Sequence, residues 1–243
     1  MRRRLLPYYG IRQSKIDMIV LHTVAYNVED AINSFYQSEV SSHYIVAENG
    51  EVWQLVGEKR RARHAGVSYW RGIEDINSHS IGIEFCSGSL GQKKFNRAQM
   101  KSGIELIKKI VKKYKIRPEN VVGHSDIAPS RKADPGRAFF WQELAHEGIG
   151  FWYNRSDANK MDGYSVEELL KIIGYDIKNI YASAYAFCRR FLPEKVAEVE
   201  NVIELVDNVG EGDDSLISDE EFLSVLKAVA YRYCNESKTP CSI

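Results

Sequence analysis

Cysteine, net charge and long apolar runs are all scarce in this chain of 243 residues. The cysteines have no CxxC spacing, which indicates neither a disulfide framework nor a cysteine zinc site; they are Cys86, Cys188, Cys234 and Cys241. Basic and acidic residues balance at 33 each, so no net field favours nucleic acid or a membrane surface. No run reaches the roughly 18 apolar residues of a transmembrane helix.

The opening MRRRLLPYYG is basic like the start of a signal peptide, but Gly10 and Arg12 soon interrupt its apolar stretch. With no recognisable signal peptide, we expect a soluble protein of the cytoplasm with reduced cysteines. The alternative compartment is the periplasm or cell envelope. We expect neither a nucleic-acid partner nor a transmembrane segment, and the sequence leaves the oligomeric state open.

Strand and helix patterns alternate from residue 16 to about residue 145. The apolar run Met18–Leu21 is typical of a buried strand and ends at His22. Asn49-Gly50 predicts a hairpin between its flanking strands. The other expected elements are strands at Ser42–Ala47, Glu51–Leu55, Ser80–Phe85 and Val121–Val122, a helix over Val28–Tyr36 capped by Asn27, and an amphipathic helix after Asn96. This alternation predicts an α/β fold with its chemistry at strand ends.

After about residue 160 the strand patterns stop and only helix patterns remain. Helices are expected over Ser165–Ile173, Ile180–Phe191, Lys195–Val206 and Ser218–Tyr233, the last with a capping box from Ser218 to Glu221. Residues 147–163 have no apolar period. We therefore expect a catalytic domain over residues 1–146, a linker over 147–163 and a small all-α domain over 164–243. The catalytic part should fold without the helical one.

The stretch GHSDIAPSRKADPG, residues 123–136, carries the densest chemistry of the chain. His124 and Asp134 lie ten residues apart, with Lys132 just before the aspartate. A zinc site takes lone pairs from such side chains on separate rigid elements, and a catalytic one keeps a position open. His22, at the end of the first strand, would supply another nitrogen. Taken singly, residues of these types in such positions are more often structural than metal ligands, and the signal lies in the whole set.

Five motifs in order resemble the zinc-dependent N-acetylmuramoyl-L-alanine amidases, the family that also includes peptidoglycan-recognition proteins. They are VLHTVA, VSSHYIVAENG, RHAGVSYWRG, NSHSIGIEF and VVGHSDIAPSRKADPG, and they cover about residues 16 to 145. The resemblance implies a mixed central β-sheet flanked by helices. It also implies one zinc ion per chain, held by His22, His124 and Asp134, with Glu84 and Lys132 as catalytic residues.

These implied roles agree with the chemistry of the residues. Zinc lowers the pKa of bound water to about 7, and Glu84 at the end of a strand can take a proton and pass it on. Lys132 can stabilise the developing oxyanion. The resemblance also implies that His64, Ala65, Gly66, Tyr69 and Trp70 line the substrate cleft, with the aromatic rings available for stacking. Asp126 can support His124 or cap a turn.

The implied reaction is hydrolysis of the amide bond between N-acetylmuramic acid and L-alanine of peptidoglycan, in wall turnover or recycling. The pairing of SIGIE with KADPG favours 1,6-anhydro-muropeptides as substrate. The helical part resembles a peptidoglycan-binding module through ASAYAFCRRFLP and GEGDDSLISDEEFLSVLKAV. Two alternatives stay open, a non-catalytic peptidoglycan receptor and a metal peptidase without a sugar requirement. Receptors of this type generally lack a metal ligand, and all three are present here.

Overall fold

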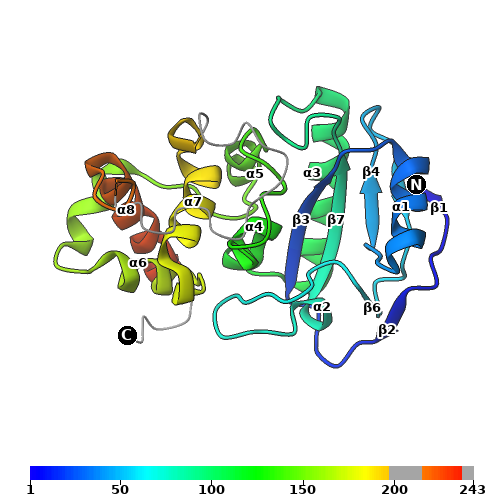
Figure 1. Ribbon diagram of the computed structural model, residues 1–243, viewed down its shortest axis with the longest axis horizontal. Helices are drawn as coiled ribbons and strands as arrows, with labels where there is room; N and C mark the ends of the chain where they lie inside the picture. The colour runs from blue at the N-terminus through cyan, green and yellow to red at the C-terminus, as the bar shows by residue number, and fades with distance from the viewer. Residues whose placement is uncertain (197–214, 237–243) are drawn as a thin grey trace.

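The computed structural model describes residues 1–196 and 215–236. A β-sheet occupies one end of the long axis and the helices α6, α7 and α8 the other, with α4 and α5 between them (Figure 1). The strands are β1 (Arg2–Arg3), β2 (Tyr9–Ile11), β3 (Met18–Val24), β4 (Tyr44–Val46), β5 (Val52–Gln54), β6 (Arg60–Ala62), β7 (Ser80–Cys86) and β8 (Val121–Gly123). The α-helices are α1 (Val28–Ser38), α2 (Ile76–His79), α3 (Arg97–Tyr114), α4 (His124–Ile127), α5 (Trp141–His146), α6 (Val166–Ile173), α7 (Ile180–Phe191) and α8 (Glu220–Glu236).

The main sheet has six strands in the order β1-β5-β4-β7-β3-β8. Only β4 and β5 pair antiparallel, through the predicted hairpin, and the other neighbours are parallel. Strands β2 and β6 form a separate antiparallel pair. The sheet is therefore mixed, as expected. Its two long strands, β3 and β7, are neighbours in its interior and are fully or almost fully buried.

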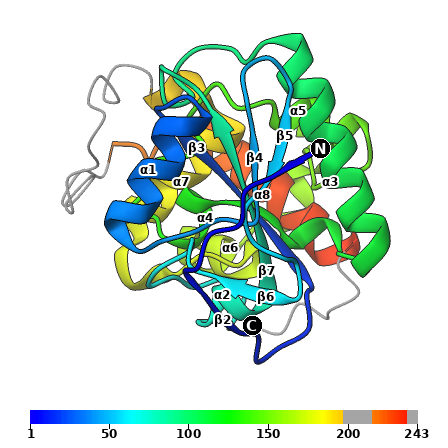
Figure 2. The same cartoon turned by 90° about the vertical axis from the view of Figure 1, so that its right-hand side faces the viewer.

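Helices cover both faces of the sheet (Figure 2). Successive residues of a strand point to opposite faces. Ile19 and Leu21 of β3 pack with Ile107 of α3 on one face. Met18 and Val20 point to the other face, which α1 covers at one end and the helical part at the other. His22 has the same parity as Met18 and Val20, so it lies on the second face.

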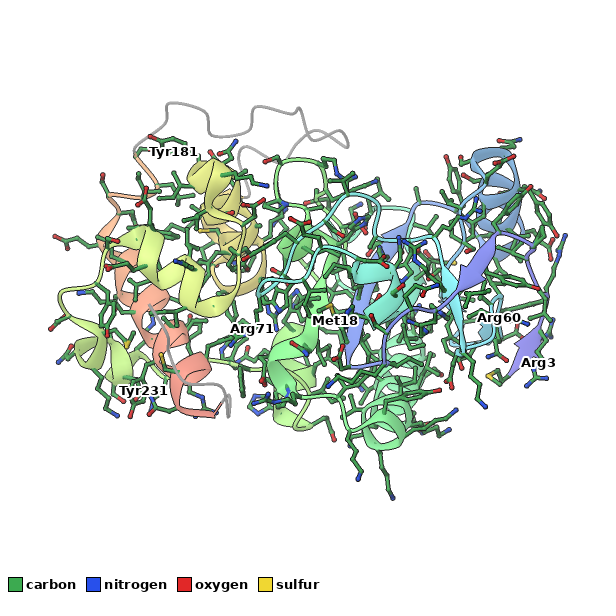
Figure 3. All side chains as sticks on the ribbon, turned by 90° about the horizontal axis from the view of Figure 1, so that it is seen from below. Arg3, Met18, Arg60, Arg71, Tyr181 and Tyr231 are labelled. Carbon is green, nitrogen blue, oxygen red and sulfur yellow. The ribbon has the colours of Figure 1, made fainter. Side chains whose placement is uncertain are left out.

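The helical part shares one apolar cluster with the sheet part. Met18, Val20 and Trp70 belong to the same buried cluster as Leu170 and Phe187. Arg71 lies at the boundary between the two parts (Figure 3), and its guanidinium donates to the carbonyl oxygens of Ile172 and Ile173. The predicted domain division stays a prediction, but among the described residues the two parts pack as a continuous interior.

Most predicted elements are found, with local differences. Helix α6 has its capping box at Ser165, and α7 has the predicted bounds. Asp219, not Ser218, caps α8, because its side chain accepts the Phe222 N–H. The region expected to be a linker contains 3-10 helix Arg155–Met161. The helix predicted over Lys195–Val206 lies mostly outside the described residues.

Two observations bear on the expected environment of the chain. Cys86 and Cys188 are free and buried, whereas Cys234 is disulfide-bonded, which the cysteine spacing did not predict. Within the described ranges, the structure has no helix both long and apolar enough to cross a membrane.

Candidate metal centre

The first two functional groups come from the register of the central strands. Strands β3 and β7 run parallel, and His22 is paired with Glu84 in the ladder. Both side chains are buried, at 2% and 7% exposure. Backbone hydrogen bonds of the sheet therefore fix these side chains next to each other on one face.

The other groups come from the segment that follows β8. His124 is the first residue of α4, a single helical turn, and the chain then returns toward the sheet. The Ser125 N–H donates to the carbonyl oxygen of Asp134 at 2.8 Å, and the Thr23 hydroxyl of β3 donates to that of Pro135, also at 2.8 Å. The Asp134–Pro135 peptide bond is cis. These contacts bring Asp134 beside both histidines.

The structure brings the three expected ligands together. His22 Nδ1 lies 3.0 Å from His124 Nδ1, and these nitrogens lie 3.1 and 3.2 Å from Asp134 Oδ2. Of the described residues, only these three form a group of His, Cys, Asp and Glu that could hold a metal ion. Ligands about 2.0–2.1 Å from a tetrahedral zinc ion are about 3.3 Å apart, close to the observed separations.

The hydrogen bond of His124 fixes which of its nitrogens carries the proton. His124 Nε2 lies 3.1 Å from the carbonyl oxygen of Ala65, which can only accept. A neutral His124 therefore has its proton on Nε2 and its lone pair on Nδ1, facing His22 and Asp134. Lone pairs this close repel one another unless a cation or proton lies among them, so the donor set suits a metal ion.

A chain of hydrogen bonds assigns the tautomer of His22 in the same way. The Ser80 hydroxyl donates to the carbonyl oxygen of Ile76 at 2.7 Å and can therefore accept from His64 Nε2 at 3.2 Å. His64 Nδ1 is then an acceptor for the N–H of His22 Nε2 at 3.0 Å. We call this chain of hydrogen bonds from Ser80 through His64 to His22 the relay. It leaves the lone pair of His22 on Nδ1, facing His124 and Asp134.

The glycine of β7 makes room for this relay. A Cβ atom on Gly82 would lie 2.6 Å from Cγ of His64, closer than real Cβ atoms approach other atoms. Ser80, Gly82 and Glu84 alternate along β7, so they share the face that bears the site. The roles of Ser80 and Gly82 were not expected, although their period of two within the motif SIGIE was the available signal.

The electrostatics of Glu84 suit a proton acceptor. Burial raises the pKa of Glu84 well above its usual range, Asp134 raises it further, and Lys132 opposes the rise. For His22, burial lowers the pKa to about 4, so its ring is neutral and able to bind a metal at neutral pH. Groups with pKa values perturbed in this way and gathered in a cleft are typical of active sites.

All five predicted chemical groups line one cavity of about 540 Å³, namely His22, Glu84, His124, Lys132 and Asp134. His64, Ala65 and Gly66 also line it, as expected for the cleft. Tyr69 instead lines a neighbouring cavity of about 450 Å³. The structure corrects the expectation for Trp70, which is 0% exposed and donates its indole N–H to the carbonyl oxygen of Glu119. Its ring packs edge-on against Tyr175 in the core and not in the cleft.

Asp126 forms its hydrogen bonds with groups other than the ring of His124. Its Oδ2 accepts the Gly123 N–H at 2.8 Å and caps α4, as one of the two expected roles required. It also accepts hydrogen bonds from Tyr175 and Arg190 of the helical part, which no sequence pattern predicted.

Comparisons with known proteins identify the family of the chain. The family model for N-acetylmuramoyl-L-alanine amidase matches residues 12–137. N-acetylmuramoyl-L-alanine amidase AmiD of Escherichia coli is 41% identical over 188 residues, which are 68% of this chain and 68% of AmiD.

Two solved structures are similar to nearly the whole chain. One is AmiD from E. coli with the substrate anhydro-N-acetylmuramic acid-L-Ala-D-gamma-Glu-L-Lys, at a TM-score of 0.72 and 32% identity, covering 95% of this chain and 93% of that one. The other is AmpDh3 from Pseudomonas aeruginosa with anhydromuramic pentapeptide, at a TM-score of 0.73 and 28% identity, covering 95% and 96%.

Proposed function

The chain belongs to the N-acetylmuramoyl-L-alanine amidase family, and from this we propose that it is an amidase that hydrolyses the bond between N-acetylmuramic acid and L-alanine in peptidoglycan fragments. The observation that carries the proposal is the gathering of His22, Glu84 and His124 with Lys132 and Asp134 around one cavity. The proposed substrates are 1,6-anhydro-muropeptides, because the similar AmiD and AmpDh3 structures hold anhydro-muramic ligands.

We propose that His22 Nδ1, His124 Nδ1 and Asp134 Oδ2 hold one zinc ion. Three observations support this assignment: the spacing of the ligand atoms, the hydrogen bonds made by the other nitrogen of each histidine, and the burial of both histidines. Zinc bound there supplies a Lewis acid that activates water and polarises the amide carbonyl. The protein orients both imidazoles through hydrogen bonds to their outer nitrogens, which favours metal binding at the inner ones.

Glu84 and Lys132 are the proposed catalytic residues. Glu84 lies beside His22 with a raised pKa, so its carboxylate accepts a proton from the attacking water and passes it to the leaving nitrogen of L-alanine. Lys132 brings a positive charge into the same cavity, where it stabilises negative charge on the carbonyl oxygen as the carbon becomes tetrahedral.

Incubation of the purified protein with an anhydro-muropeptide, followed by mass spectrometry, tests the proposal. We expect free stem peptide and anhydro-N-acetylmuramic acid, and we expect Glu84→Gln to lower the rate about 10²–10⁴-fold while zinc stays bound. Tight binding without any product would indicate a receptor. Cleavage of peptides without the sugar would indicate a peptidase. Intact sacculi, digested in parallel, show whether polymeric wall is also a substrate.

The compartment is part of the same proposal. We propose the cytoplasm, where soluble anhydro-muropeptides would be the substrate, with the cell envelope as the alternative. Fractionation of cells that express the full protein distinguishes the two.

A further inference from the structure

Three buried polar side chains meet where the helical part packs on α4. Asp126 of α4 is 1% exposed, Tyr175 after α6 is 1% exposed, and Arg190 of α7 is 3% exposed. The Tyr175 hydroxyl donates to Asp126 Oδ1 at 2.7 Å, and Arg190 donates through Nη1 to Asp126 Oδ2 at 2.9 Å. We name this group the buried triad.

Both charged groups of the buried triad, the Asp126 carboxylate and the Arg190 guanidinium, have partners. Asp126 accepts from two side chains and from the Gly123 N–H. The guanidinium of Arg190 also donates to the carbonyl oxygen of Val121 at 3.3 Å and lies over the Trp141 ring, 4.1 Å from its centroid. Removing one member of a buried, hydrogen-bonded ion pair is strongly destabilising, because the other charge loses its partner.

The contacts of the triad converge on the backbone that presents His124. Val121 and Gly123 are the first and last residues of β8, and His124 follows directly. Arg190 and Asp126 are thus hydrogen-bonded to the strand that leads directly into this metal ligand. The adjacent Arg189 donates through Nη1 to the carbonyl oxygen of Lys132 at 3.5 Å, in the same segment.

We infer that Tyr175 and Arg190 are positioning residues of the metal centre, acting through Asp126. Both lie outside residues 12–137, which match the family model. On this inference, the helical part is a structural component of the metal centre, whether or not it also binds cell wall. The inference rests on the metal site proposed above and extends it beyond the segment that carries the ligands.

The test measures zinc affinity of the full-length protein by competition with a chelator, without any substrate. Tyr175→Phe keeps the ring against Trp70 and removes only the hydroxyl that reaches Asp126. Loss of a residue that supports metal ligands typically weakens metal binding about 10–100-fold. We expect the zinc Kd to rise about 10-fold in Tyr175→Phe and about 100-fold in Arg190→Met.

Lys227→Met is the matched control, because it removes a cation of the helical part whose partner, Asp162, is largely exposed. Its zinc Kd should equal that of the parent. Melting curves in chelator show that each variant is folded, and if Arg190→Met does not fold, Tyr175→Phe decides. A folded Tyr175→Phe with the zinc Kd of the parent overturns the inference. A parent that binds zinc but cleaves no muropeptide would contradict the proposed function alone.

Discussion

Replacement of His64 by Phe tests the relay that orients His22. Phe keeps a flat ring above Gly82 but has neither the acceptor for the His22 N–H nor the donor to Ser80. His22 is 2% exposed, so water does not replace the lost partner. An unsatisfied buried donor costs about 1–3 kcal/mol.

The relay also keeps the lone pair of His22 on Nδ1, so its loss should appear in metal binding. Loss of support for a metal ligand lowers affinity about 10–100-fold, or about 1.4–2.7 kcal/mol. This range of free energies is similar to the cost of leaving the His22 N–H without an acceptor. We expect His64→Phe to bind zinc that much more weakly and to show a smaller rise in melting temperature when zinc is added.

Chelator competition gives the affinity, and melting curves with and without zinc give the linked stability. Ser80→Ala is the companion variant, because it removes only the far end of the relay, and its loss should be smaller. If His64→Phe binds zinc as tightly as the parent, the relay does not orient His22, and the assigned tautomer does not determine zinc affinity.

Three further predictions concern the same face of the sheet. Gly82→Ala should weaken zinc binding because its Cβ would displace the His64 ring, whereas Gly57→Ala, whose Cβ meets nothing within 4 Å, should not; equal zinc affinities would contradict this. Lys132→Ala should lower kcat about 10²–10³-fold with zinc retained, and a loss confined to KM in steady-state assays would refute its role at the oxyanion. Burial lowers the pKa of His43 to about 3, so between about pH 6.5 and 3 the unfolded chain binds the extra proton. The melting temperature of the metal-free protein should therefore fall as pH is lowered through that window, and NMR should show a neutral His43 ring at pH 5; a ring that protonates near pH 6.5 would disprove the assignment.

The sequence predicted the parts of the site that depend on strand pattern and residue type. The apolar run into His22 and the strand ending near Glu84 both indicated strand-borne groups, and the parallel register then paired them. Residues 123–136 pointed to His124 and Asp134 through their chemistry. The actual ligand geometry depends on the return of this segment past Thr23, a long-range contact with no local signal.

The features that the sequence did not predict correctly all depend on tertiary packing. The family resemblance of the motif RHAGVSYWRG implied that Trp70 lines the cleft, but the helical part buries its ring against Tyr175. The partners of Asp126 lie 49 and 64 residues away in the sequence. A pattern of helical periods predicts that helices exist, but it does not tell which of their polar residues are buried or against what.

The ligand set is divided between two segments of the chain, strand β3 and the segment that follows β8. His22 lies in a central strand whose backbone is hydrogen-bonded on both sides, so it should be released only when the sheet itself unfolds. His124 and Asp134 both lie in the segment after β8, which a local opening could move away together. Metal exchange should then proceed through a partly open state in which His22 and Glu84 remain in place, ready to receive the next ion. The lifetime of the bound metal would be set by the rate at which residues 123–136 open, and not by global unfolding.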